Sequence, residues 1–167
     1  MVKWIVRIVA LVALAAALGW GWRTFFPSDE RQIRHLLAQV AETVSVPADA
    51  KFVAGVLAAD RLKGCFTPEL EIDVEVPGAG RHTFSGREEL AQAYVAARSQ
   101  YRGLQVDFLD VVVTLGPDQQ GATAELTARV RRGGERDFAV QELRMQLAKR
   151  EQQWRISRVE TTRSIQR

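Results

Sequence analysis

The stretch Leu70–Leu90, which reads LEIDVEVPGAGRHTFSGREEL, decides the fold that this sequence predicts. In residues 70–76 apolar and acidic side chains alternate, which predicts a strand with one buried face and its acids turned away from the core. Residues 77–80 then predict a turn, and residues 81–84 a short return strand. Residues 85–88, Ser-Gly-Arg-Glu, form a capping box in sequence, so a helix is expected to begin here.

Two further helices are expected before this hairpin. In residues 29–45 apolar side chains recur at helical spacing, Ser28 is a favourable N-cap, and acids occupy the first turn. A second helix is expected from about Asp49 to Gly64, because Pro47 ends the first helix and glycine commonly follows a last turn. The side chains expected to point inward from this second helix are Phe52, Val53, Val56 and Leu57.

After the third helix, which is expected to carry Tyr94 inward and to end by Gly103, the chain alternates strands and turns. We expect four long antiparallel strands, at residues 104–115, 122–132, 136–149 and 154–162. The sequence therefore predicts an α+β domain, with three helices packed on one face of a curved, mainly antiparallel sheet.

Two local patterns in this order resemble the nuclear transport factor 2-like superfamily, which includes the SnoaL-like domains and the ketosteroid isomerases. Phe84–Leu90 is similar to the family's turn into its third helix, and Gln153–Ile156 is similar to its last strand. The resemblance spans residues 29–163 and implies a cone-shaped fold with a pocket between sheet and helices. It also implies that members are enzymes, small-ligand binders or interaction domains, so that the fold alone does not decide the function.

The N-terminal segment predicts a membrane anchor. From Trp4 to Trp22 the only charge is Arg7, and 19 helical residues reach about 28 Å, close to the thickness of a bilayer core. We therefore expect a signal-anchor at 1–23, a linker at 24–28 and the domain at 29–167. Lys3 and Arg7 favour a cytoplasmic N-terminus in the inner membrane, with the domain on the extracytoplasmic side. The alternative is a signal peptide cleaved after Ala15–Ala17.

Charge is unevenly divided along the chain. Residues 24–128 hold 9 Lys/Arg and 15 Asp/Glu, a balance of −6, and residues 129–167 hold 11 and 5, a balance of +6. We expect the two parts to pair with each other in one domain, the alternative being a basic surface for anionic lipids. A nucleic-acid partner is not expected, because no aromatic RNA motif or basic recognition helix is present. No metal or cofactor is expected either, since Cys65 stands alone and the two histidines are isolated.

Four side chains are candidates for the lining of a ligand pocket. Asp110 and Glu142 interrupt apolar strands at points where the inward face switches, as a β-bulge would produce. One interpretation places both at a pocket floor, and the other places them in solvent, paired with Arg129 or Arg144. The two other candidates are the inward Tyr94 and, on the short return strand, His82; the alternatives are core packing for the tyrosine and an ordinary edge-strand position for the histidine.

No catalytic set is predicted. The resemblance to ketosteroid isomerase implies a carboxylate base at the end of the first strand, within residues 73–77. Only Asp73 and Glu75 are available there, and both are predicted to face outward.

We therefore expect a membrane-tethered, non-enzymatic domain that binds a partner protein or a small hydrophobic ligand through its cavity or its sheet. The alternative is a SnoaL-like enzyme of the cyclase, isomerase or hydrolase type, acting on a small hydrophobic substrate. The resemblance also implies dimerisation through the sheet. The polar residues expected on the outer sheet face indicate that any such interface would be modest: Glu125, Thr127, Arg129 and Arg131.

Overall fold

The computed structural model describes residues 28–49, 52–76, 80–98, 101–132 and 138–165. The predicted anchor at 1–23 and the linker up to residue 27 lie outside these ranges. No helix within the described ranges has the length and apolar character that crossing a bilayer requires.

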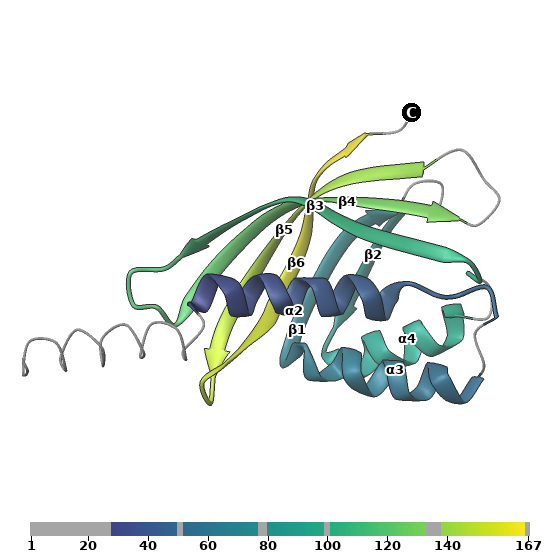
Figure 1. Cartoon of the computed structure of the whole chain (residues 1–167), viewed down its shortest axis with the longest axis horizontal. Helices are drawn as coiled ribbons and strands as arrows, with labels where there is room; N and C mark the ends of the chain where they lie inside the picture. Colours follow the sequence, from purple (N-terminus) through teal and green to yellow (C-terminus); the bar gives the residue numbers. More distant parts are fainter. Residues whose placement is uncertain (1–27, 50–51, 77–79, 99–100, 133–137, 166–167) are drawn as a thin grey trace, which may run out of the picture.

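Six strands form one sheet in the order β2-β1-β6-β5-β4-β3 (Figure 1). β1 and β6 are parallel, and all other neighbours are antiparallel, so the predicted mainly antiparallel sheet is confirmed. The prediction for residues 104–115 matches its strand to the residue, whereas β1 begins four residues earlier than the predicted alternation at Leu70. The bounds are β1 Phe66–Val76, β2 Gly80–Ser85, β3 Leu104–Leu115, β4 Gly121–Arg132, β5 Phe138–Arg150 and β6 Gln153–Ile165.

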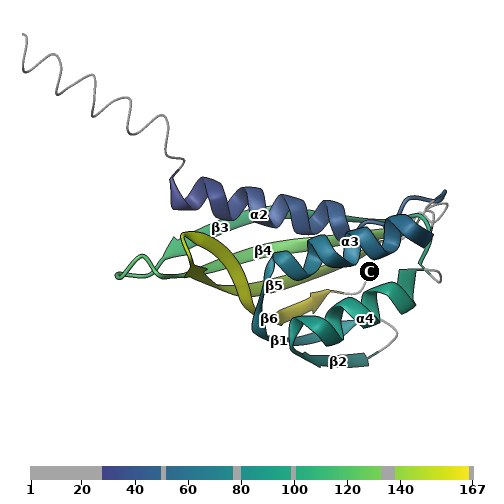
Figure 2. The ribbon, with the colours of Figure 1, turned by 90° about the horizontal axis from the view of Figure 1, so that it is seen from below.

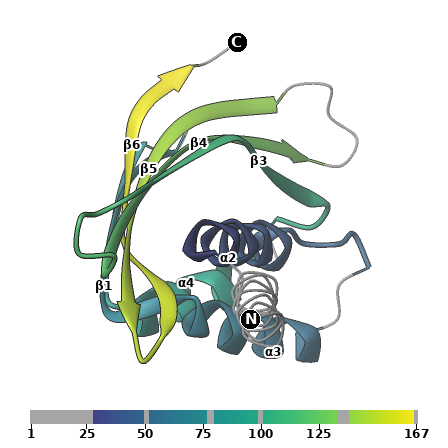
Figure 3. The same cartoon turned by 60° about the vertical axis from the view of Figure 1, so that its left-hand side comes forward.

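Three helices lie on the concave side of this sheet (Figures 2 and 3). They are α2 (Asp29–Val44), α3 (Phe52–Gly64) and α4 (Arg87–Arg98). α2 runs across the sheet and buries Ile33, Leu37 and Val40 against it, as the helical spacing predicts. Ser28 precedes this helix but makes no side-chain cap. Its hydroxyl instead accepts a hydrogen bond from Arg31 at 3.3 Å.

The inward face predicted for α3 is wrong. Val53, Val56 and Leu57 are 70%, 44% and 58% exposed, and the Phe52 side chain lies outside the described part. The buried stripe consists of Gly55, Ala59 and Leu62, which has the same helical period. Periodicity cannot choose between two apolar stripes. The stripe with the smaller side chains, which begins at Gly55, faces inward because α3 packs closely on α4.

The start of α4 differs from the predicted capping box by one residue. Gly86 precedes the helix with φ = 88°, a conformation that glycine adopts without steric cost. The side chain that returns to the cap is Glu89, whose Oε2 accepts a hydrogen bond from the Ser85 N–H at 2.8 Å. Glu88, the predicted partner, instead forms an ion pair with Lys63 of α3 at 3.3 Å.

The expected pairing between the acidic and basic parts of the chain is confirmed by cross-strand ion pairs. Arg129 and Arg131 contact Asp107 at 3.0 and 3.4 Å. Arg144 contacts Glu125 at 2.9 Å. The outer face of the sheet, opposite the helices, is therefore a polar surface.

Candidate functional site

The bulge predicted around Asp110 is present, and Asp110 lies in solvent. The pairing of β3 with β4 shifts between Leu109 and Val112, and Asp110 is exposed with φ = 53°. Asp110 is therefore exposed to solvent, but it does not form the ion pair expected with Arg129 or Arg144. Arg129 binds Asp107, and Arg144 binds Glu125.

Glu142 lies on β5, where the register with β6 shifts next to it. Its side chain is partly exposed. Its backbone carbonyl accepts a hydrogen bond from the Thr162 hydroxyl at 3.1 Å. On the same sheet, His82 is exposed on β2 and stacks on Phe84, with ring centroids 6.4 Å apart.

Tyr94 points inward from α4, as predicted. Its hydroxyl donates a hydrogen bond to the Thr43 carbonyl at the end of α2, at 2.7 Å, and accepts one from Arg98. The Arg98 guanidinium carbon also lies 5.6 Å from the centre of the tyrosine ring. Tyr94 therefore links α2 and α4 and fixes an arginine. The hydrogen bonds of Tyr94 within the described part of the chain go to Thr43 and Arg98 and not to His82, Asp110 or Glu142, so the structure does not bring the four candidates together.

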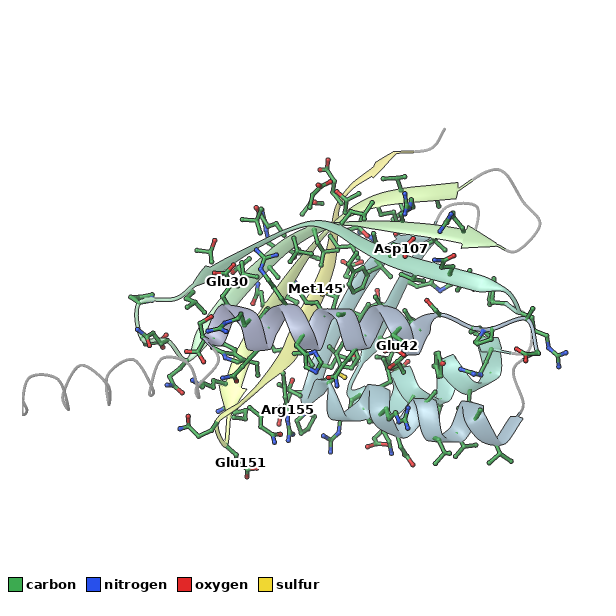
Figure 4. All side chains as sticks on the ribbon, in the orientation of Figure 1. Glu30, Glu42, Asp107, Met145, Glu151 and Arg155 are labelled. Carbon is green, nitrogen blue, oxygen red and sulfur yellow. The ribbon has the colours of Figure 1, made fainter. Side chains whose placement is uncertain are left out.

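A cleft of about 1200 Å³ lies between α2 and α3 and is also lined by the start of β6 and by the segment around Leu104. We call it the α2–α3 cleft. Figure 4 shows Glu42 on the side of α2 that faces α3 and α4. The apolar side chains that line the α2–α3 cleft include Leu36, Val46, Ala54, Ala58, Leu104 and Trp154. The ionisable side chains that line it are His35, Glu42, Arg61, Cys65 and Arg98.

A second, smaller groove of about 570 Å³ separates α2 from β3. Leu37 and Ala38 line it from the helix, and Asp107 and Phe108 from the strand. The hydrogen bond from Arg129 lowers the pKa of the Asp107 carboxyl despite partial burial, so this acid stays ionised beside its arginines. Neither His82, Asp110 nor Glu142 lines either cleft.

The interior between α2 and the sheet is occupied by core side chains. Trp154, Ile156 and Met145 are 5%, 0% and 3% exposed and belong to one apolar cluster with α2. Met145 is labelled in Figure 4. Cys65 is buried at the exit of α3, and its burial raises the pKa of the thiol. No three His, Cys, Asp or Glu side chains of the described residues lie close enough to hold a metal ion.

A partly buried ion pair lies beside Trp154. Asp29 Oδ1 accepts hydrogen bonds from Lys149 Nζ at 2.7 Å and from Trp154 Nε1 at 2.9 Å. Burial raises the pKa of the Asp29 carboxyl, but the two hydrogen bonds and the charge of Lys149 outweigh it, so the pKa lies below its usual value. The cluster joins the start of α2 to the β5–β6 hairpin.

Sequence reasoning missed Arg98 and Lys149. Arg98 follows Tyr94 by four residues, a spacing that places both on one helix face, and this is a signal that the sequence contains. The Asp29–Lys149 contact spans 120 residues and leaves no local pattern.

Comparison with known proteins agrees with this geometry. The family model of the SnoaL-like domain matches residues 27–160, and the chain therefore belongs to the SnoaL-like domain family. No curated protein matches the chain.

Three solved structures show the same fold at low identity. A protein from Kribbella flavida is 21% identical with a TM-score of 0.65, over 84% of this chain and 93% of that one. A nuclear transport factor 2-like protein with a cystatin-like fold from Novosphingobium aromaticivorans is 23% identical with a TM-score of 0.60, over 90% and 88%. A putative scytalone dehydratase from the same organism is 15% identical with a TM-score of 0.57, over 83% and 87%.

Proposed function

We propose that this SnoaL-like domain is a non-enzymatic binding module that takes a small hydrophobic ligand into the α2–α3 cleft. The observation that carries the proposal is the cleft itself, with a volume of about 1200 Å³ and a mixed lining. Its apolar side chains include Ala54, Ala58, Leu104 and Trp154, and many of its polar side chains come from α2. Ligand sites of proteins are concavities of several hundred Å³ that combine apolar walls with polar groups that orient the ligand, and this cleft contains both.

Binding is favoured over turnover because Asp73, which the isomerase resemblance implies as a base, does not line the α2–α3 cleft, where the acid present is Glu42. Asp73 pairs with Arg81 at 3.1 Å, and Glu71 pairs with Arg158 at 3.0 Å, both on the outer face of the sheet. A general base must reach the proton that it removes, and these carboxylates lie on the face opposite the helices.

The proposal is tested by occupancy of the cleft and by blocking it. The full-length protein would be gently solubilised from its own membranes, and bound small molecules identified by native mass spectrometry. Ala58→Trp fills the α2–α3 cleft, and Ala38→Trp is the matched control because that alanine lines the second groove. We expect Ala58→Trp to lose the ligand and Ala38→Trp to retain it.

Other results would replace the proposal. A protein partner with an empty cleft would make the domain a scaffold. A ligand that the protein returns chemically changed would make it an enzyme. Equal ligand loss in the two variants would move the site away from the cleft.

Residues 4–22 form the membrane tether in this proposal, because they are apolar apart from Arg7. A tether raises the effective concentration of the domain at the bilayer, where hydrophobic ligands reside. A reporter fused after Arg167 is expected to be active only on the extracytoplasmic side. Cytoplasmic activity would refute this topology, and an intact mass lacking the first residues would show cleavage instead of a tether.

A further inference from the structure

Arg98 is the last residue of α4, and its side chain lines the α2–α3 cleft. It is partly buried and held over the Tyr94 ring, with one N–H donated to the tyrosine hydroxyl. Tyr94 is itself fixed by its bond to the Thr43 carbonyl. The guanidinium therefore occupies one position that two helices define.

Gly55 of α3 makes room for this arginine. A Cβ atom at Gly55 would lie 2.9 Å from Arg98 Cδ and 3.2 Å from Nε, closer than such atoms ordinarily approach. Gly55 is buried in the first turn of α3, and within a helix glycine costs up to roughly 1 kcal/mol relative to alanine. The close approach of Arg98 gives a physical reason for glycine at this position.

The guanidinium has donors left over. Arginine carries five N–H groups, and among the described residues its one side-chain hydrogen bond is to Tyr94. No described carboxylate forms an ion pair with it, although other arginines of the domain do have such partners. The charged side chains of the cleft lining are Arg61, Arg98 and Glu42, so the cleft has a net positive charge.

We propose that Arg98 binds the anionic head of an amphipathic ligand, a carboxylate or a phosphate, whose hydrocarbon chain lies against Ala54, Ala58 and Leu36. This inference rests on the proposed function and names the class of its ligand. A planar guanidinium with free N–H groups matches carboxylate and phosphate oxygens in pairs, and its partial burial strengthens such contacts. Ala54 and Ala58 of α3 provide the apolar wall against which the hydrocarbon part of the ligand packs.

The test uses the full-length protein in nanodiscs of phosphatidylcholine, with isothermal titration of three ligands that share an eight-carbon chain. Octanoate and octyl phosphate carry the two anionic heads, and octanol carries none. Empty nanodiscs correct for partition into the bilayer, and inorganic phosphate tests the head without the chain. We expect both anions to bind at least tenfold more tightly than octanol, and inorganic phosphate to bind far more weakly than octyl phosphate.

Two variants test the role of Arg98. Arg98→Met is expected to weaken the anions about tenfold to a hundredfold and to leave octanol unchanged, since charge-assisted bonds are lost. Arg34→Met is the matched control, because that arginine is exposed on α2 and pairs with Glu30 outside the α2–α3 cleft; it should bind as the wild type does.

Gly55→Ala provides a second variant that keeps the charge. It displaces the Arg98 side chain while improving helix propensity, so binding of the anions should fall several-fold with no loss of thermal stability. A purely structural role of Arg98 would leave the preference for anions over octanol unchanged in both variants.

The outcomes separate this inference from the proposed function. Equal binding of octanol and octanoate would overturn the anion site and leave hydrophobic binding in place. Binding of inorganic phosphate as tight as that of octyl phosphate would also overturn it, by making free phosphate the ligand. No binding of any eight-carbon ligand, or binding that Ala58→Trp does not reduce, would overturn both.

Discussion

Replacing Asp29 by asparagine removes one charge from the partly buried ion pair that joins α2 to the β5–β6 hairpin. The side chains of Asp29 and Lys149 are 16% and 15% exposed, so hydration compensates little for the loss of the ion pair. The variant leaves the lysine ammonium without its carboxylate, while the amide oxygen still accepts from Trp154. A hydrogen bond to a charged group contributes about 1.5–3 kcal/mol, and removal of one partner from a buried pair costs at least as much.

We therefore expect Asp29→Asn to lower the free energy of unfolding by about 2 kcal/mol. With an unfolding entropy of roughly 0.3 kcal/mol/K for a domain of this size, this is a fall in Tm of about 7 °C. The pKa of Asp29 is lowered in the folded state from its usual value of 3.8. Its contribution is therefore fully present above about pH 4 and is lost as the pH falls through the folded pKa.

Urea unfolding of wild type and variant between pH 7 and pH 3 measures both effects. The difference should be constant from pH 7 to pH 5 and should shrink below pH 4. Glu30→Gln is the matched control, because Glu30 is the next residue but 51% exposed in an i,i+4 pair, and it should cost under about 0.5 kcal/mol. A loss for Asp29→Asn no larger than that of the control, or one independent of pH, would refute the reasoning.

Three further predictions concern other parts of the domain. Asp110→Gly should raise the urea midpoint slightly and Asp110→Val should lower stability by roughly 1–2 kcal/mol, because φ = 53° is strained for a β-branched residue; equal midpoints would contradict this backbone. Leu62→Ala should cost about 2–4 kcal/mol and Leu57→Gln almost nothing, since the first is 1% and the second 58% exposed; a reversed order would restore the predicted face of α3. Cys65 should react with a thiol reagent at pH 8 much more slowly than free cysteine, because the thiol is 7% exposed at the wall of the α2–α3 cleft and its pKa is raised; labelling as fast as that of free cysteine would argue against its burial.

The sequence predicted the strands and the fold class well because their signals are local. Alternation in residues 70–76, the break at Pro47 and the turn around residues 150–153 each depend on neighbouring residues alone. The bulge at Asp110 was also predictable, because a switch of the inward face within one strand leaves a mark in the sequence.

The faces and the clefts were harder to predict because they depend on contacts between distant segments. α3 has two apolar stripes, and the choice of Gly55, Ala59 and Leu62 is made by packing on α4. Arg98 lines a cleft because Gly55, which lies far earlier in the chain, leaves space for its side chain. The sequence supplies the side chains of such a site without showing that they meet.

The parallel pairing of β1 with β6 constrains the order in which the chain assembles. β6 is the last strand to be synthesised, yet it lies inside the sheet, between β1 and β5. Until it exists, the β1–β2 hairpin has no edge to join, and β3, β4 and β5 form a separate ribbon. The complete sheet therefore forms only after β6 has left the ribosome, and a premature stop before residue 153 divides the sheet in two instead of trimming its edge.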